Sequence, residues 1–332
     1  MYQIKISQKD AGQRLDKYLH RILPEAGSGF LYKMLRKKNI TLNDKKATGG
    51  EKIVEGDHVT IYFSDGTLEK FMGRKIPHEE NYKSAYEQIQ NVRILYESEH
   101  VLLVDKPAGV LSQKAERTDI SLNEWLIGYL LQSGAVTEEK LTRYKPSVCN
   151  RLDRNTSGIV LCAKTLKGAQ LLSELLKNRT LHKYYLLYAK GIITDEQLIE
   201  GYLIKDEKLN KVYIEPVNHG VKGLEQIQAS YIKTGYRPIG TEKDKTLLEV
   251  ELFTGKTHQI RAHLASVGHP LLGDYKYGDK TWNDEYRKKY QVKAQLLHAY
   301  KVVFPQLDET FADLSGKEFI AETPEIFRKV SS

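Results

Sequence analysis

Residues 149–163 read CNRLDRNTSGIVLCA, and the character of the chain changes sharply within them. The second part, Ile159–Ala163, is a short continuous apolar run of the kind that forms a buried strand. The first part is polar and places Asp153 between Arg151 and Arg154. We therefore expect a loop that enters a buried strand and holds a carboxylate beside cationic side chains.

Arginines around Asp153 favour its ionised form, so the carboxylate stays charged near neutral pH. Such a group can act as a nucleophile, a base, a metal ligand or half of a structural ion pair. From these residues alone, the structural ion pair is favoured. A metal site has little support because no second carboxylate or histidine lies close in sequence. Glycoside chemistry would need a paired second acid to which nothing in the sequence points.

Alternating and continuous apolar runs predict strands on both sides of this loop, at 94–96, 101–104, 182–191, 247–252 and 296–299. Helices are predicted around 125–131 and over 166–177. Another helix is expected after Thr257, which can serve as its N-cap, and Gly268 ends it. Its buried stripe is expected to contain Ile260, Leu264 and Val267.

The composition narrows the class of protein. The chain has 332 residues and a formal net charge of +8, with 40% hydrophobic and 28% charged residues. This length suggests two domains, and the composition excludes disordered and fibrous classes. No apolar run reaches the roughly 18 residues of a membrane helix, and residues 1–10 lack the apolar core of a signal peptide. Two cysteines, Cys149 and Cys162, argue against a disulfide scaffold and favour a cytoplasmic location.

Basic residues are concentrated near the N-terminus. Residues 14–46 contain nine Lys and Arg against three Asp and Glu, which accounts for +6 of the net charge. Two helices are predicted there, over 14–23 and 28–38, with Ser28 as the N-cap of the second and strands at 40–44 and 59–63. Apolar residues of the second helix face inward, and its basic residues face outward to form an edge that can contact an RNA backbone: Lys33, Arg36, Lys37 and Lys38.

This arrangement resembles the small RNA-binding domain named after the S-four ribosomal protein, over about residues 12–63. The resemblance rests on RLDKYL, on the helix at 28–38 and on ITLNDKK. We predict an RNA-binding domain over 1–64 and a polar linker over 65–91. Within that linker, Leu68, Phe71 and Met72 are expected to dock on a neighbouring element.

The remainder, residues 92–332, is identified as a catalytic domain by its resemblance to the RluA family of RNA pseudouridine synthases. The motif RLDRNTSG at 151–158 carries the resemblance, together with five others in the family's order. These are KPAG from Lys106, K-x-Y from Lys183, TGKTHQIRAH from Thr254, GHP from Gly268 and GDYKYG from Gly273. The resemblance implies an α+β fold: a mixed, largely antiparallel sheet with flanking helices, preceded by the small N-terminal α+β domain.

The resemblance also implies residue roles. Asp153 is similar to the family's essential aspartate, which acts on a flipped-out uridine either at C6 of the base or at the ribose. Tyr185 matches the tyrosine that lies under the target base and can assist removal of the proton from C5, and Arg261 matches the basic residue that pairs with the aspartate and keeps it ionised. Arg151 matches the arginine that fills the space left by the extruded base. Extrusion is required because a stacked base hides its glycosidic bond. No cofactor or metal is implied.

Other polar residues of these motifs receive lesser roles. Lys106 and Lys183 are expected to be charge partners or phosphate contacts, and His258 and His263 to be structural or RNA-contacting. The sequence departs from the family pattern at three positions that carry no catalytic role: Asn150 stands before RLD where His is common, Gln113 also replaces a His, and Lys256 replaces an Arg.

Together these features predict a cytoplasmic, monomeric enzyme that isomerises uridine to pseudouridine in structured RNA, with large-subunit ribosomal RNA as the expected substrate. Two alternatives remain open: the same chemistry on transfer RNA, and a non-catalytic RNA-binding or ribosome-assembly factor. The joint presence of Asp153, Tyr185 and Arg261 argues against a pure binder, which needs none of the three. The sequence does not separate ribosomal from transfer RNA as the substrate, because RNA is recognised largely by shape and by flipped bases.

Overall fold

The computed structural model describes residues 2–72, 79–116, 118–206, 211–217 and 229–331. The chain divides into two compact units, Met1–Ser84 with Ile127–Pro146, and Ala85–Leu126 with Ser147–Ser332. Within the described ranges, every helix is too short or too polar to span a bilayer.

The first unit begins with a small sheet and two helices. Its four strands have the order β1-β4-β2-β3, with antiparallel pairing throughout. Apolar side chains of both helices are buried in one core, among them Leu15, Leu19, Leu31 and Leu35. The elements are β1 (Tyr2–Lys5), α1 (Leu15–Ile22), α2 (Ser28–Arg36), β2 (Ile40–Leu42), β3 (Lys45–Lys46) and β4 (His58–Ile61).

Two details of this unit differ from the sequence prediction. Gly27, rather than Ser28, is the N-cap of α2, and no side chain caps the helix. The Ser28 hydroxyl instead forms a hydrogen bond with Nε2 of His20 in α1, 3.1 Å away. A hydroxyl can therefore join two helices at a position where sequence favours a cap.

The predicted linker over 65–91 contains two helices, α3 (Asp65–Met72) and α4 (Glu79–Gln88); residues 73–78 lie outside the described part of the chain. Leu68, Phe71 and Met72 pack against the core of the first unit, which confirms that they dock on a neighbour. The rings of Phe30 and Phe71 lie 4.5 Å apart. Spacings of three and four residues place these apolar side chains on one helical face, so the segment folds onto the core rather than remaining extended.

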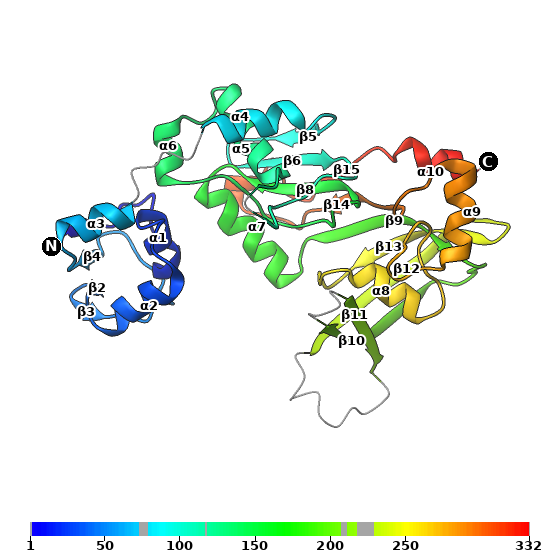
Figure 1. The fold of residues 1–332 in the computed structure, drawn as a ribbon, viewed down its shortest axis with the longest axis horizontal. Helices are drawn as coiled ribbons and strands as arrows, with labels where there is room; N and C mark the ends of the chain where they lie inside the picture. The colour runs from blue at the N-terminus through cyan, green and yellow to red at the C-terminus, as the bar shows by residue number, and fades with distance from the viewer. Residues whose placement is uncertain (1, 73–78, 117, 207–210, 218–228, 332) are drawn as a thin grey trace. The chain divides into compact units, whose positions relative to one another are not determined.

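The second unit is built on one large mixed sheet (Figure 1). Its path is β11-β10-β12-β13-β9-β14-β8-β6-β5, with β15 beside β14 and β7 beside β8. Among the described strands only β14 and β8 pair in parallel, which confirms the predicted, largely antiparallel sheet. The strands are β5 (Arg93–Glu97), β6 (Val101–Lys106), β7 (Ser147–Val148), β8 (Ser157–Ala163), β9 (His182–Lys190), β10 (Gln197–Asp206), β11 (Lys211–Pro216), β12 (Ala229–Glu242), β13 (Lys245–Leu252), β14 (Leu297–Val303) and β15 (Glu318–Ile320).

Helices cover this sheet through separate apolar clusters. Leu172 and Leu175 of α7 pack with β6 and β8, while Trp282 of α9 packs with β9. Ala262 of α8 packs against β10, β11 and β12. The helices after α4 are α5 (Leu122–Gln132), α6 (Glu138–Arg143), α7 (Leu166–Asn178), α8 (Gln259–Ser266), α9 (Lys280–Tyr290) and α10 (Glu325–Val330).

The start and the buried face of α8 differ from the prediction. His258, with φ of 55°, is the N-cap in place of Thr257, and Val267 is 41% exposed rather than buried. Every residue from Gln259 to Leu264 is buried, so the helix has no single apolar stripe. Its buried polar side chains must therefore find partners within the fold.

Candidate active site

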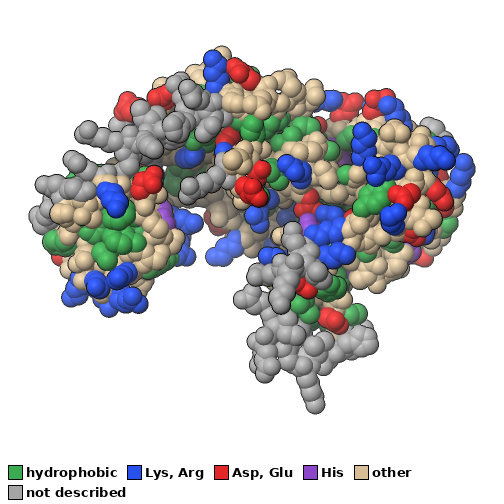
Figure 2. Space-filling view, viewed as in Figure 1, with side chains coloured by type: hydrophobic (Ala, Val, Ile, Leu, Met, Phe, Trp, Pro, Cys, Tyr) green, Lys and Arg blue, Asp and Glu red, His purple; other side chains and the backbone are tan. Residues whose placement is uncertain are grey.

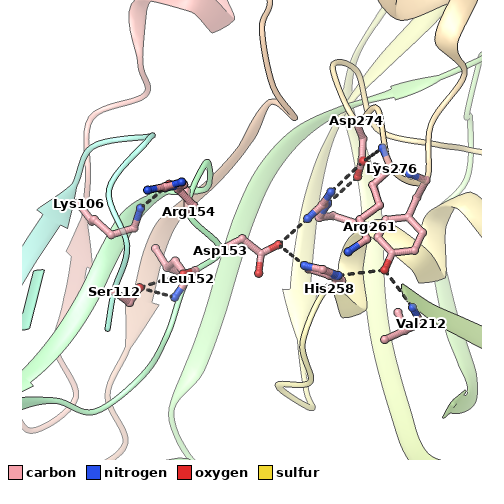
Figure 3. Close-up of polar contacts among 11 residues, drawn as sticks. Lys106, Ser112, Leu152, Asp153, Arg154, Val212, His258, Arg261, Asp274 and Lys276 are labelled. Carbon is pink, nitrogen blue, oxygen red and sulfur yellow. Dashed lines mark hydrogen bonds and ion pairs between the residues drawn. The ribbon is translucent and has the colours of Figure 1, made fainter. Parts of the chain in front are cut away.

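The loop that carries Asp153 is fixed on both sides. Ser112 is buried, and its hydroxyl donates to the carbonyl of Leu152 at 2.9 Å and accepts from the Leu152 amide at 3.0 Å. On the other side, Nζ of Lys106 donates to the carbonyl of Arg154 at 3.2 Å. These bonds hold the backbone around Asp153 in one conformation (Figure 3).

Lys106 is fully buried, so it cannot contact a phosphate as the sequence analysis allowed. Its Nζ also donates to the carbonyls of Pro107 at 3.0 Å and Val110 at 2.8 Å. Three carbonyl acceptors match the three protons of an ammonium group. Burial nevertheless lowers the pKa of Lys106 to about 7, while the charge of Asp153 opposes that shift. Lys106 thus joins the KPAG turn to the loop that carries Asp153.

Asn150, one of the departures from the family pattern, ties the start of this loop to β8. Its Oδ1 accepts from the Leu161 amide at 2.7 Å, and its Nδ2 donates to the Ile159 carbonyl at 3.4 Å. The side-chain amide satisfies one donor and one acceptor of the strand, so Asn at this position has a structural function of its own.

Asp153 and Arg261, which are 108 residues apart in sequence, form the central ion pair of the site. Nη1 of Arg261 lies 2.9 Å from Oδ2 of Asp153. Arg261 is only 7% exposed, and its other guanidinium nitrogens hold Asp274 through Nε–Oδ2 at 2.6 Å and Nη2–Oδ1 at 2.9 Å. A bidentate pair of this geometry fixes the plane of the guanidinium. Figure 3 shows Arg261 between the two carboxylates.

The ionisation of these groups follows from their contacts. Burial alone would lower the pKa of Arg261, but its hydrogen bonds to Asp274 and the charges of Asp274 and Asp153 raise that pKa above its ordinary value. Burial would likewise raise the pKa of the Asp274 carboxyl, yet Arg261 holds it below its usual range. The guanidinium and the Asp274 carboxylate are therefore both charged at neutral pH.

Sequence reasoning matched the GDYKYG motif but gave Asp274 no role. The side chain is 1% exposed, and its Oδ1 also accepts from the amides of Lys276 at 2.9 Å and Tyr277 at 3.1 Å. No local signal in the sequence marks this role, because the need for a second carboxylate beside Arg261 follows only from the burial of α8 on all sides.

The arginines that flank Asp153 in sequence do not pair with it. Arg151 and Arg154 are both exposed, and the described contacts of Asp153 are with Arg261 and His258. The ionised carboxylate expected from the sequence is thus paired as the resemblance implied, rather than with its immediate neighbours. Arg151 stands at the surface beside the site.

Tyr185 lies on β9 and is 6% exposed. Its burial, and then the charge of Asp153, raise its pKa, so the phenol is protonated at neutral pH. Among the described residues its hydroxyl makes no hydrogen bond. Lys183, two residues earlier, shares this face of the strand, and burial lowers its pKa.

The two histidines of the TGKTHQIRAH motif differ in their surroundings. His263 is 1% exposed, and its Nδ1 forms a hydrogen bond with the hydroxyl of Thr234 at 3.0 Å. Burial lowers the pKa of His263 to about 4, so it is neutral and structural. His258 faces the site: its Nε2 lies 3.9 Å from Oδ2 of Asp153, and its Nδ1 lies 2.9 Å from the hydroxyl of Tyr277.

The described residues indicate neither a reactive thiol nor a cluster of metal ligands at this site. Burial raises the pKa of Cys149 to about 12, which leaves the thiol protonated and poorly nucleophilic. No group of three or more metal-ligating side chains occurs among the described residues.

The predicted RNA contacts of the first unit lie on its surface. Lys33, Arg36, Lys37 and Lys38 are exposed at the C-terminal half of α2 and just beyond it. Lys45 and Lys46 of β3 are exposed as well. Figure 2 shows Lys and Arg side chains gathered on this part of the unit. We call these six residues the basic edge.

Comparison with known proteins places this geometry in a family. The RNA pseudouridylate synthase family matches residues 100–266. Ribosomal large subunit pseudouridine synthase C of Vibrio vulnificus is 28% identical over 307 residues, 91% of this chain and 87% of that protein. An uncharacterized RNA pseudouridine synthase of Mycoplasma genitalium is 30% identical over 312 residues, 91% of this chain and 89% of that protein.

The solved structure of human RNA Pseudouridylate Synthase Domain Containing 4 shares the fold, with a TM-score of 0.58 at 19% identity. The match covers 75% of this chain and 95% of the human one. The sequence motifs, the family match and the relatives agree: this chain belongs to the RNA pseudouridylate synthase family, as an RNA pseudouridine synthase of the RluA group.

Proposed function

We propose that this enzyme forms pseudouridine in large-subunit ribosomal RNA and that Asp153 is its reacting carboxylate. Relatives from Vibrio vulnificus and Nitrosomonas europaea, similar over more than 90% of this chain, are named as synthases C and D of the ribosomal large subunit. The named substrate of those proteins is the reason for choosing ribosomal over transfer RNA.

One observation carries the role of Asp153: its carboxylate is 24% exposed while its partner Arg261 is buried and locked to Asp274. A buried guanidinium in a bidentate pair is a fixed positive charge, and it costs no reorganisation when a substrate arrives. Asp153 is consequently paired with a fixed cation on one side and open to solvent on the other. A carboxylate that only stabilised the fold would not need that access.

The reaction is an isomerisation with no net change in atoms. The C1′–N1 bond breaks, the uracil rotates, and a C1′–C5 bond forms; C5 then loses its proton and N1 gains one. Asp153 can start this by adding to C6 of the base or by acting at the ribose. Both routes need an ionised carboxylate beside an extruded uridine, which Arg261 supports.

Tyr185 and Arg151 fit supporting roles in this proposal. The raised pKa of Tyr185 makes a phenolate base unavailable near neutral pH, so we assign its ring to packing against the uracil. Arg151 is exposed two residues before Asp153 in the same loop, and we assign it to the space in the stack that the uridine leaves. Its guanidinium can stack on bases as well as contact phosphate.

The basic edge of the first unit is proposed to anchor the RNA, as the likeness to the S-four domain implies. Exposed Lys and Arg side chains bind phosphates without reading sequence, and they add affinity through release of counterions. The four residues Lys33, Arg36, Lys37 and Lys38 are the part of this edge that the sequence predicted.

Tritium release from RNA labelled at C5 of uridine tests the proposal. Large-subunit ribosomal RNA fragments should release tritium with the wild-type enzyme, whereas transfer RNA transcripts should not. Asp153→Asn should release none yet bind the fragments with nearly unchanged affinity, because phosphate contacts dominate binding. Losing an essential nucleophile costs several orders of magnitude, so activity of Asp153→Ala within about tenfold of wild type would contradict the role.

A further inference from the structure

His258 occupies a backbone conformation that is uncommon for residues other than glycine, although His adopts it more often than most. Its φ of 55° lies in the left-handed region, where a Cβ is disfavoured and Gly or Asn is common. Strain of this kind persists where the surrounding structure determines it, and it is concentrated at functional sites. The conformation turns the imidazole of this N-cap residue toward Asp153 (Figure 3).

Both nitrogens of the imidazole face groups of the site. Nδ1 lies 2.9 Å from the Tyr277 hydroxyl, which in turn accepts a hydrogen bond from the Val212 amide of β11 at 3.1 Å. Nε2 lies 3.9 Å from Oδ2 of Asp153, within ion-pair range and beyond hydrogen-bond distance. Catalytic contacts of this length commonly tighten when substrate binds.

The order of donors and acceptors selects one tautomer. Val212 can only donate through its amide, and the Asp153 carboxylate can only accept. If Tyr277 donates its hydroxyl proton to Nδ1, then the proton of the neutral ring is on Nε2 and points at Asp153. The other tautomer turns a lone pair toward the carboxylate and leaves the Tyr277 proton without this acceptor.

A neutral ring fits its surroundings. Burial lowers the pKa of His258, and the charges of Arg261 and Lys276 lower it further, whereas Asp153 and Asp274 oppose the shift. The N-terminus of α8 also disfavours an imidazolium, since it is the positive end of the helix dipole.

Arg261 and His258 both approach the same oxygen of Asp153, Oδ2. Arg261 Nη1 lies 2.9 Å from Oδ2, and His258 Nε2 is directed at Oδ2 as well. Among the described residues, Oδ1 has no hydrogen-bond partner, and Figure 3 shows it pointing away from both.

We propose that Tyr277 and His258 are positioning residues for Asp153: Tyr277 fixes the tautomer, His258 presents Nε2–H to Oδ2, and Oδ1 is left as the oxygen that meets the uridine. This inference rests on the proposed role of Asp153. His258 then gives Asp153 a second hydrogen-bond donor besides Arg261. This role also explains why a histidine with a positive φ stands at the N-cap of α8.

Two substitutions of His258 separate positioning from backbone strain. The side-chain amide of glutamine reaches about as far as Nε2, and that of asparagine only about as far as Nδ1. Asparagine, however, tolerates φ above zero better than glutamine. A positioning role therefore ranks His258→Gln above His258→Asn in activity, whereas a purely structural role reverses the order.

The experiment is single-turnover tritium release with saturating enzyme, together with RNA affinity for each variant. We expect His258→Gln to stay within about threefold of wild type. His258→Asn and His258→Leu should fall about 10- to 100-fold, the loss typical of a misplaced catalytic group, with affinity nearly unchanged. Tyr277→Phe should slow the step, while Tyr275→Phe, whose hydroxyl contacts only Asp284 among described residues, should not.

Nitrogen-15 chemical shifts of the His258 ring report the tautomer directly, with His258→Gln used to assign the signals. The proposal expects the proton on Nε2 in the wild type and a mixture in Tyr277→Phe. A proton on Nδ1, full activity of His258→Leu, or asparagine matching glutamine would overturn it. Asp153→Asn runs in parallel: if it were active, the proposed function would fail, whereas its inactivity beside an active His258→Leu would reject this inference alone.

Discussion

The basic residues of the two units illustrate opposite uses of positive charge. Arg261 is buried, and each side of its guanidinium meets a carboxylate at hydrogen-bond distance. Lys33, Arg36, Lys37 and Lys38 are exposed on the first unit. A buried charge must be paired and is hardly screened, whereas exposed charges act together at longer range and weaken with salt. We expect the buried charge of Arg261 to determine the rate of the chemical step and the exposed charges of the first unit to determine the affinity for RNA.

The strongest test of this contrast removes the buried charge. Arg261→Met should lower single-turnover tritium release by about two orders of magnitude, because Asp153 and Asp274 lose their shared counter-charge and Asp153 loses the donor that orients it. Arg261→Lys should retain part of the activity, since it keeps the charge without the planar fork. Full activity of Arg261→Met would refute the pairing.

A smaller effect is expected from replacement of Asp274, the second carboxylate that pairs with Arg261. Asp274→Asn keeps the shape of the side chain but removes one partner charge from Arg261, so turnover should fall about tenfold. Asp284→Asn is the control, because that residue pairs only at the surface with Lys280 and Tyr275. Equal rates in the two variants would show that the orientation of Arg261 does not depend on Asp274.

The same pair predicts a dependence of stability on pH. Arg261 holds the pKa of the Asp274 carboxyl below its ordinary value of about 3.9. The ion pair of Asp274 with Arg261 therefore contributes its full stability above about pH 3.9, and that contribution is lost as the pH falls through the pKa of Asp274 in the folded state. Asp274→Asn should therefore flatten acid unfolding below about pH 4, followed by circular dichroism. An unchanged acid transition would contradict this account.

The exposed charges should affect affinity instead of rate. Reversal of Lys33, Arg36, Lys37 and Lys38 to Glu should weaken RNA binding by about tenfold or more at low salt. It should also make the salt dependence shallower by about 0.7–0.9 in the log–log slope for each lost phosphate contact. The matched control exchanges Lys and Arg at the same four positions. An unchanged slope would show that the basic edge does not anchor the RNA.

The last expected effect is on stability alone and concerns the buried lysine. Lys106→Met leaves the carbonyls of Pro107 and Val110 without a described donor, whereas that of Arg154 keeps the Gly109 amide, and each unsatisfied group costs about 1–3 kcal/mol. Since about 1 kcal/mol lowers Tm by roughly 2–4 °C in a domain of about 150–250 residues, we expect Tm to fall by at least about 4 °C. The exposed Lys177→Met in α7 serves as the control, and equal Tm values would contradict the assigned role of Lys106.

Sequence predicted those parts of the fold in which pattern and burial coincide. The strands at 101–104 and 159–163 were found because their side chains are apolar on both faces, as buried strands require. Strands β10 to β12 were not predicted. Their exposed positions carry apolar residues such as Leu198, Tyr231 and Ile239, so alternation is lost.

The site was only partly predictable for a related reason. Motifs located Asp153 and Arg261, but the contacts that define the site join residues that are distant in sequence or turned by an unusual backbone. Asp274 acquires meaning only once Arg261 is buried beside it. His258 depends on a positive φ at the start of a helix, where sequence favoured Thr257 as the cap. Tertiary contacts of this kind leave no local pattern.

The most direct test maps pseudouridines in large-subunit ribosomal RNA from cells that lack this protein. The same map is made after the protein is restored to these cells, either as wild type or as Asp153→Asn. The account predicts that at least one pseudouridine disappears without the protein, returns with the wild type and stays absent with Asp153→Asn. Restoration by Asp153→Asn, or an unchanged map in cells without the protein, would contradict it.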